Sequence, residues 1–190
     1  MVRIVPLRSD RRFDINTTSR SDSWTRGLSP FFLGPCSLYG GHSAKRVENA
    51  WQFCKVYPSH VDENQDPSDE YWTWAKKGWA DSQARRYPMG RGAAPLYSLW
   101  QERRLSYVEA RRTIYIPVYA AALVRSEAWR ILKGVYATLG EITLSDFDGY
   151  DHRELQMSWD EVVDCRERKM GHAFVIGMLL EGHLDENEFL

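Results

Sequence analysis

The chain has 190 residues, of which 43% are hydrophobic and 27% are charged, so its length and composition predict one globular domain with a substantial core. Its 25 Lys and Arg residues nearly balance 26 Asp and Glu residues, and a formal charge of −1 argues against a dedicated nucleic-acid coat protein. The longest apolar stretch, residues 116–124, contains Pro117 and falls short of the roughly 20 residues that a bilayer span needs. No membrane span is therefore expected.

Several other classes of protein lack their sequence signals. No apolar run follows the first basic residues, which argues against a secretory signal and predicts a cytoplasmic protein. The three cysteines have no CxxC spacing, and the five histidines show no HExxH motif. Neither a disulfide framework nor a metal site is expected, and the absence of a GxSxG turn argues against a serine hydrolase.

The first half of the chain is predicted to hold a short strand, an irregular arm and two helices. Residues 2–5 alternate like a strand, whereas residues 10–27 are polar and have no period. Ser43 is a suitable N-cap for a helix over 44–57, which Pro58 stops. Aromatic residues at helical spacing predict a second helix over 71–86.

A basic, glycine-containing segment over residues 85–92 follows the second helix. Its glycines leave the backbone bare, so an anionic group could approach closely, and Arg85 and Arg91 become candidate phosphate contacts. The segment has neither the Walker ending nor the context of a Rossmann turn. An ordinary basic loop is the alternative interpretation.

The second half is predicted to be mainly helical. Helices are expected over 105–112 and 119–136, with Pro117 kinking or separating them, and a strand is expected over 141–147. A capping box at 158–161 opens a further helix, and an apolar helix follows over 173–180. These elements predict a single α+β domain, mainly helical with a few short strands. Its expected parts are an N-terminal strand and arm (1–27), the domain proper (28–182) and a frayed acidic tail (183–190).

Two groups of side chains carry chemistry. Glu48, Gln52 and Lys55 have the spacing i, i+4, i+7, so on one helix a carboxylate, an amide and an amine would address the same ligand. A solvated charged face is the alternative. The second group is an acidic cluster where the later strand ends, made of Asp146, Asp148, Tyr150 and Asp151.

These residues together suit an enzyme that acts on a glycosidic bond. Carboxylates can stabilise a ribosyl cation and activate water, and arginines can hold phosphate. Trp51 and Trp100 offer flat surfaces for a base, and a neutral Lys55 amine could instead attack the anomeric carbon and form an imine. Alternatively, Trp100 covers the core, and Asp148 and Tyr150 shape the turn.

Several motifs occur in a suggestive order: Phe31-Phe32-Leu33, then the stretch VENAWQFCK over 47–55, then Leu139-Gly140-Glu141 leading to Asp146 and Asp151, and finally Met170-Gly171-His172. In this order and spacing the chain resembles the NADAR family, over about residues 28–180. Glu48, Gln52 and Lys55 match the family's helix motif, and Trp100 resembles its later Trp. The sequence departs from the family pattern at Gly34-Pro35, which replaces Ser-Asn, and at Asp146, which replaces a Glu.

The resemblance implies a YbiA-like fold and an N-glycosidase that needs no metal or redox cofactor. The implied substrate is an ADP-ribosylated or phosphoribosylated base, such as ADP-ribosyl-guanine, free or on DNA, or a ribosylamino-pyrimidine phosphate. The expected catalytic residues are Glu48, Lys55, Asp146 and Asp151. The expected substrate-binding residues are Trp51, Gln52, Arg85, Arg91, Trp100, Asp148 and Tyr150.

Two other classes of function remain open. A binding module would capture an ADP-ribose-like nucleotide without turning it over, which the departures from the family pattern favour. A nucleic-acid-associated protein would use the basic N-terminal arm, whose arginines are Arg3, Arg8, Arg11, Arg12, Arg20 and Arg26. The base and the oligomeric state are not predicted.

Overall fold

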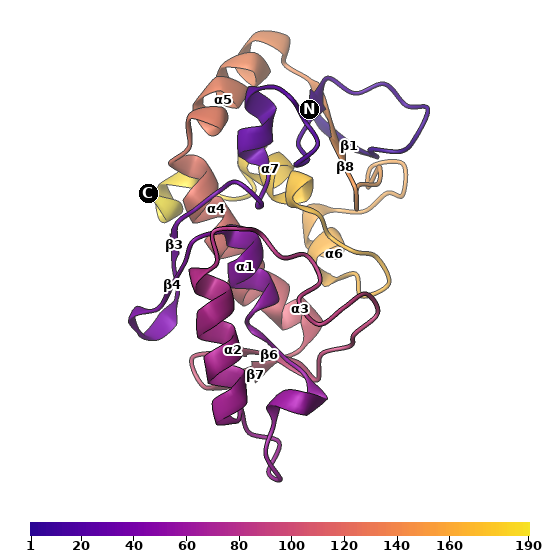
Figure 1. Ribbon diagram of the computed structural model, residues 1–190. Helices are drawn as coiled ribbons and strands as arrows, with labels where there is room; N and C mark the ends of the chain where they lie inside the picture. The colour runs from indigo at the N-terminus through magenta and orange to yellow at the C-terminus, as the bar shows by residue number, and fades with distance from the viewer. The chain divides into compact units, whose positions relative to one another are not determined.

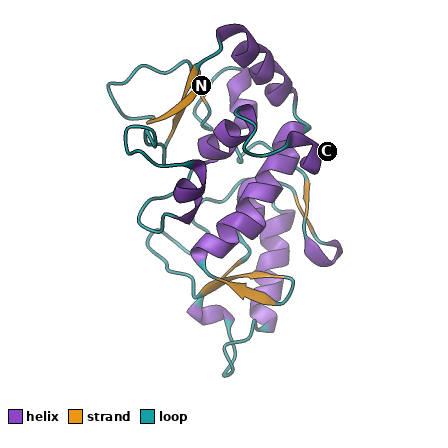
Figure 2. Cartoon of the chain, turned by 180° about the vertical axis from the view of Figure 1, so that it is seen from behind, coloured by secondary structure: helices purple, strands orange, loops and turns teal.

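A computed structural model describes all 190 residues of the chain (Figure 1). The fold is α+β, as predicted, and helices and loops make up most of it while the strands are short (Figure 2). The chain forms two compact units, which we call the terminal unit (residues 1–33 and 119–190) and the central unit (residues 34–118). None of the helices combines the length and the apolar composition that a membrane crossing requires.

The terminal unit contains a three-stranded parallel sheet in the order β1-β8-β2. The bounds of its strands are Val2–Pro6 for β1, Ile15–Asn16 for β2 and Ile142–Asp146 for β8. Figure 1 labels the neighbouring strands β1 and β8. Pro6 pairs with Asp146, so the register of β1 fixes the end of β8 where that carboxylate lies. The strands predicted over 2–5 and 141–147 are both confirmed.

The terminal unit also contains five complete helices. Their bounds are Trp24–Leu28 for the 3₁₀ helix η1, Glu127–Leu139 for α5, Trp159–Asp164 for α6, His172–Leu180 for α7 and Glu186–Phe189 for the 3₁₀ helix η5. Of these, α7 packs on β1 and β8, and η1 contacts β2. α7 is buried along nearly its whole length, which explains why its sequence is apolar on all sides. Gly177 leaves room for the Trp159 ring, since a Cβ there would lie 2.7 Å from that ring.

Two segments of the terminal unit are more ordered than predicted. Residues 10–27, expected to be irregular, contain β2 and η1, and Ser23 caps η1 by accepting from the Thr25 amide. The tail past Gly182 forms η5 instead of fraying. Glu186 holds it in place, because its carboxylate accepts from Trp129 Nε1 at 2.8 Å and pairs with Lys133.

The central unit has a two-stranded hairpin, β3-β4, and a three-stranded antiparallel sheet in the order β5-β6-β7. The strands are Cys36–Ser37 (β3), Ser43–Ala44 (β4), Lys55–Val56 (β5), Tyr97–Trp100 (β6) and Arg103–Leu105 (β7). The helices are Tyr39–Gly41 (η2), Val47–Gln52 (α1), Pro58–His60 (η3), Asp69–Ala80 (α2), Tyr107–Ala110 (α3) and the π-helix Arg111–Tyr115 (η4).

The helix predicted over 119–136 is in fact two helices. α4 spans Ile116–Val124, and α5 starts afresh at Ser126, whose hydroxyl accepts from the Trp129 amide. Pro117 was expected to kink or separate the helices over 105–112 and 119–136, but α3, η4 and α4 follow one another without a break. This proline lies in the first turn of α4, just after the π-helix η4, and the wider turn of a π-helix accommodates a residue that lacks an N–H donor.

Candidate functional site

A chain of hydrogen bonds joins three of the predicted site residues in the central unit. Gln52 Nε2 donates to Glu48 Oε1 at 2.9 Å, and Lys55 Nζ donates to Gln52 Oε1 at 2.7 Å. Glu48 and Gln52 are buried, with exposed fractions of 6% and 8%, and Lys55 is half-buried. The carboxylate, the amide and the amine are therefore brought together, as the sequence predicted.

The geometry behind that prediction was wrong, because the three residues do not share one helix. α1 begins at Val47 and ends at Gln52, whereas Ser43 and Ala44 form β4 and Lys55 begins β5. Lys55 pairs with Ser98 across the sheet, and the Leu99 amide donates to the Cys54 carbonyl at 2.7 Å. These ladder bonds satisfy backbone groups that a longer helix would have used internally, so pairing with β6 ends the helix.

The orientation of the Gln52 amide follows from its two neighbours. A carboxylate only accepts hydrogen bonds, so the NH₂ group must face Glu48, and the carbonyl oxygen is left to accept from the Lys55 amine. A neutral amine keeps two N–H groups, so the contact with Gln52 survives deprotonation and leaves a lone pair for nucleophilic attack.

Trp51 lies beside the amine. Lys55 Nζ is 4.8 Å from the centre of the Trp51 ring, within the range of a cation–π contact. The Tyr115 ring lies 5.1 Å from Trp51 and the Tyr107 ring 6.3 Å. The other predicted aromatic surface, Trp100, lies on β6 with its ring 4.9 Å from that of Tyr39.

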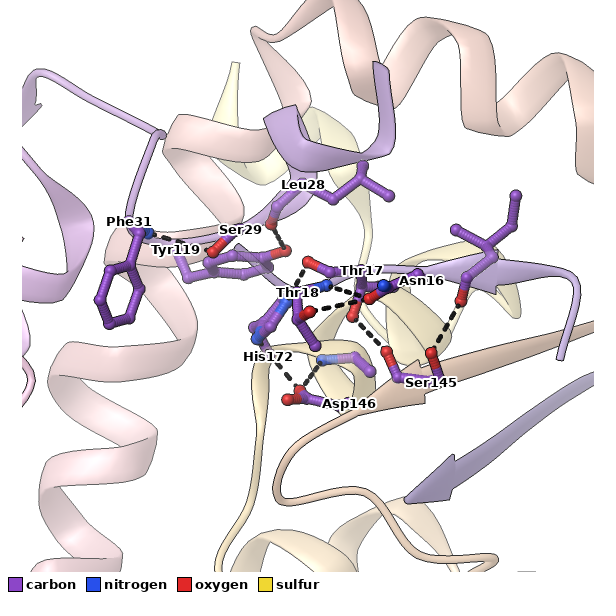
Figure 3. A network of polar contacts seen from close by, with 12 residues as sticks. Asn16, Thr17, Thr18, Leu28, Ser29, Phe31, Tyr119, Ser145, Asp146 and His172 are labelled. Carbon is purple, nitrogen blue, oxygen red and sulfur yellow. Dashed lines mark hydrogen bonds and ion pairs between the residues drawn. The ribbon is translucent and has the colours of Figure 1, made fainter. Parts of the chain in front are cut away.

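The acidic group belongs to the terminal unit, where Asp146 is almost fully buried. Figure 3 shows the Asp146 carboxylate facing His172. One carboxylate oxygen, Oδ2, lies 3.0 Å from His172 Nδ1 and accepts from the Ala173 amide at 3.1 Å. Gly171 precedes α7 and has no side chain to cap it, so Asp146 accepts from the first turn of that helix instead. A Cβ at Gly171 would lie 2.2 Å from the same oxygen, which shows how closely the two segments approach.

These contacts set the charge of Asp146. Burial raises its pKa, but the His172 imidazole, and hydrogen bonds from that ring and from the backbone amides of Ala173 and Asp148, outweigh burial and hold the pKa below its ordinary value of 3.8. His172 Nε2 lies 2.8 Å from the Thr17 carbonyl oxygen. Both partners of the ring are acceptors, so the contacts are satisfied together only by the doubly protonated imidazolium.

The remaining members of the acidic group also contact other parts of the protein. Asp151 Oδ2 lies 3.5 Å from Arg11 Nη1 of the N-terminal arm. Asp151 Oδ1 accepts from the amides of Arg153 and Glu154 at 3.1 and 3.3 Å, which closes the turn that follows it. The Tyr150 ring packs 4.6 Å from Phe174. The Asp148 amide donates to Asp146, as described above. The four predicted catalytic residues are thus divided, with Glu48 and Lys55 in the central unit and Asp146 and Asp151 in the terminal unit.

Arg85 and Arg91 lie on an exposed loop of the central unit. Arg85 Nε donates to Asp81 at 2.8 Å, and Arg91 lies 5.7 Å from the centre of the Tyr87 ring. The helix predicted over 71–86 covers only Asp69–Ala80, because the residues after it are held against α1 by the side chain of Asn49.

Sequence reasoning missed two residues of these networks. His172 was noticed only as part of a motif, and no spacing connects it to Asp146, which lies 26 positions earlier. Asn49 stands next to Glu48, and no pattern in the sequence marks it, because its partners are backbone groups more than 30 positions later.

The fold and these two clusters describe an α+β protein with a carboxylate–amide–amine chain in one unit, whose carboxylate and amide are buried, and a buried Asp–His pair in the other. The chain belongs to a family of unknown function, DUF6939, whose model matches residues 11–156. The matched segment includes all four predicted catalytic residues and ends before His172. No curated protein and no solved structure matches the chain.

Proposed function

We propose that the chain is a cytoplasmic N-glycosidase that hydrolyses the bond between a ribose anomeric carbon and a base nitrogen in an ADP-ribosylated or phosphoribosylated base. We further propose that it is a divergent member of the NADAR family with a YbiA-like fold. The observation that best supports the activity is the hydrogen-bonded chain from Glu48 through Gln52 to Lys55, beside the Trp51 ring.

Two routes use this chain. In the imine route, the Lys55 amine attacks the anomeric carbon, the bond to the base nitrogen breaks, and the base leaves with a proton. The opened sugar stays on Lys55 as an imine, which one water molecule hydrolyses to release the sugar and restore the amine. In the electrostatic route, water attacks the anomeric carbon as the bond to the base nitrogen breaks, and one proton of the water ends on that nitrogen. Glu48 stabilises the ribosyl cation while the Lys55 ammonium faces the leaving base.

The contacts of Asp146 and Asp151 favour structural roles for these two carboxylates. The Asp146 carboxylate holds His172 and the start of α7, and the Asp151 carboxylate closes a turn. We therefore assign the bond-breaking chemistry to Glu48 and Lys55, with Trp51, Gln52 and Trp100 contacting the substrate and Arg85 and Arg91 contacting its phosphates. Asp148 and Tyr150 then act as shaping residues of the turn.

The test is a base-release assay. The full chain is incubated with ADP-ribosyl-guanine, as nucleoside and in DNA, and with a ribosylamino-pyrimidine phosphate, and the free base is followed by chromatography. We expect release from at least one of them, and a loss of about 100-fold or more in the variant Glu48→Gln, the size usual for removing one group that stabilises transition-state charge. Lys76→Arg, on the exposed face of α2, is the matched control and should behave like the wild type.

Lys55→Arg and borohydride separate the two routes. The imine route predicts almost no turnover in the arginine variant, because guanidinium is not nucleophilic at neutral pH, and a covalent sugar adduct on Lys55 when borohydride is present. The electrostatic route predicts a milder loss and no adduct. Full activity in Lys55→Ala would contradict both routes.

A binding module is the second candidate, favoured by the structural contacts of Asp146 and Asp151. It predicts that the chain binds ADP-ribose or a modified base while no free base is released from any of the three substrates. Absence of both binding and release would refute both candidates.

A further inference from the structure

The side chain of Asn49 joins α1 to the segment that follows α2. Asn49 has no exposed surface, and its amide makes three hydrogen bonds: Nδ2 donates to the carbonyls of Asp81 and Gln83 at 3.0 and 2.9 Å, and Oδ1 accepts from the Arg85 amide at 2.8 Å. Both donors and the acceptor are in use. One side chain therefore fixes the backbone of this segment at every second residue, 81, 83 and 85.

That segment leads into a basic loop, residues 84–92, which we call the arginine loop. No Asp or Glu occurs between Asp81 and Glu102, while Arg85, Arg86 and Arg91 lie in that interval. Arg86 and Arg91 lie 5.5 and 5.7 Å from the centre of the Tyr87 ring, which is 45% exposed. The loop thus presents cations around a flat aromatic surface.

The backbone of the arginine loop is also open. Gly90 and Gly92 have φ values of 91° and 85°, and a Cβ at either position would meet no atom within 4 Å. These glycines therefore serve the left-handed conformation rather than close packing, and they leave room for a ligand beside the chain. The central unit supplies a favourable field, since it carries 12 Lys and Arg against 9 Asp and Glu, whereas the terminal unit carries 13 against 17.

We propose that Asn49 is a positioning residue, which sets the arginine loop against α1 so that a phosphate-bearing ligand held by the loop is also presented to Glu48 and Lys55. Neighbouring residues of one short helix make the two connections, Asn49 to the loop and Glu48 to Gln52. The inference rests on the proposed function for the chemistry at Lys55, but phosphate binding by the loop and its dependence on Asn49 can be measured without turnover.

Asn49→Asp is the informative variant. It keeps the size of the side chain and the acceptor for the Arg85 amide, but it turns two donors into acceptors that face the carbonyl oxygens of Asp81 and Gln83. Asn64→Asp adds the same charge to the same unit at an exposed position and is the matched control. Asn49→Ala removes the contacts without adding charge and replaces the aspartate variant if that one does not fold.

The first readout is the affinity for two probes, ADP-ribose and a short single-stranded oligothymidylate, which distinguish a free nucleotide phosphate from a phosphodiester. We expect Asn49→Asp to raise the Kd of the probe that binds by about tenfold, the result of losing two hydrogen bonds of ordinary strength. Arg91→Gln should weaken the same probe, and Asn64→Asp should not. Hydrogen exchange of amides 81–92 should become about 10- to 100-fold faster in Asn49→Asp, with those of β5 and β6 unchanged.

The outcomes separate this inference from the proposed function. Unchanged affinity for both probes in Asn49→Asp, with the loop amides exchanging faster, would overturn it and leave Asn49 as a purely structural residue. If the wild type releases base, KM of Asn49→Asp should be at least tenfold higher, with a smaller change in kcat. A tenfold fall in kcat with KM unchanged would also overturn the inference. If the wild type releases no base but binds a probe in a manner that depends on Asn49, the proposed function fails and this inference stands.

Discussion

Replacement of Asp146 by Asn tests whether this carboxylate is a structural group. The substitution keeps the shape of the side chain and an oxygen for the Ala173 amide, but it removes the negative charge that faces His172 at 3.0 Å. The imidazolium would then lose the counter-charge beside its Nδ1, and the Thr17 carbonyl that faces its Nε2 carries no charge to replace it. Breaking a buried pair from one side costs about 3–5 kcal/mol, so the free energy of unfolding should fall by about that amount.

The assay is urea unfolding followed by circular dichroism. With a slope of about 1–3 kcal/mol/M, the midpoint should fall by roughly 1–5 M. Asp22→Asn, at an exposed position of the same unit, is the control and should leave the midpoint unchanged. A double variant with His172→Asn should be less destabilised than the two single changes added together, because neither charge is then left alone. A loss below about 1 kcal/mol in Asp146→Asn would refute the structural role.

The lowered pKa of Asp146 also predicts that the free energy of unfolding depends on pH in acid. The pKa of Asp146 in the folded chain lies below its ordinary value of 3.8, so the ionised group stabilises the fold fully above that value. This contribution is lost as the pH falls below 3.8 and through the lowered pKa. The gap in unfolding free energy between the wild type and Asp146→Asn should therefore narrow below about pH 4, and a gap that widened there would contradict the assignment.

Three further predictions concern packing and reactivity. Gly171→Ala should destabilise the chain by about 1–3 kcal/mol in urea unfolding, because its Cβ would lie 2.2 Å from the Asp146 carboxylate, and an unchanged midpoint would contradict that close approach. Gly134→Ala, within α5 and with nothing within 4 Å of its Cβ, should instead stabilise by about 0.5–1 kcal/mol. Burial raises the pKa of Cys36 and of Cys54 to about 11, so at pH 8 a disulfide reagent should modify only Cys165 in the folded chain, and rapid reaction of more than one thiol would disprove the burial.

Short sequence patterns correctly predicted the helices and strands that depend on neighbouring residues. The capping box at Ser158 and Glu161 opens α6 as expected, and the alternating strands β1 and β8 pair with each other. Long-range contacts decided the rest. α1 stops at Gln52 because β6 pairs with the residues that follow, and α2 stops at Ala80 because Asn49 binds the backbone beyond it. Neither partner is visible in a window of the sequence.

The candidate site shows the same division between local and long-range information. The prediction that Glu48, Gln52 and Lys55 lie close together assumed a single helix. Their side chains do form a hydrogen-bonded chain, although Lys55 lies on a strand. By contrast, helical spacing could not reveal that Asp146 meets His172 at the start of α7.

The position of Lys55 on β5 bears on how its amine could work. Its backbone is fixed by pairing with Ser98, while Gln52 is fixed by α1, so the hydrogen bond between their side chains joins two independently held elements. An amine held at both its backbone and its tip has little freedom left to lose on meeting a substrate, which favours an oriented attack. Gln52 is buried, and its amide has one satisfactory orientation between a carboxylate and an amine. Of the three residues, Gln52 is therefore the one that sets the direction of the Lys55 amine, while Glu48 sets the direction of Gln52.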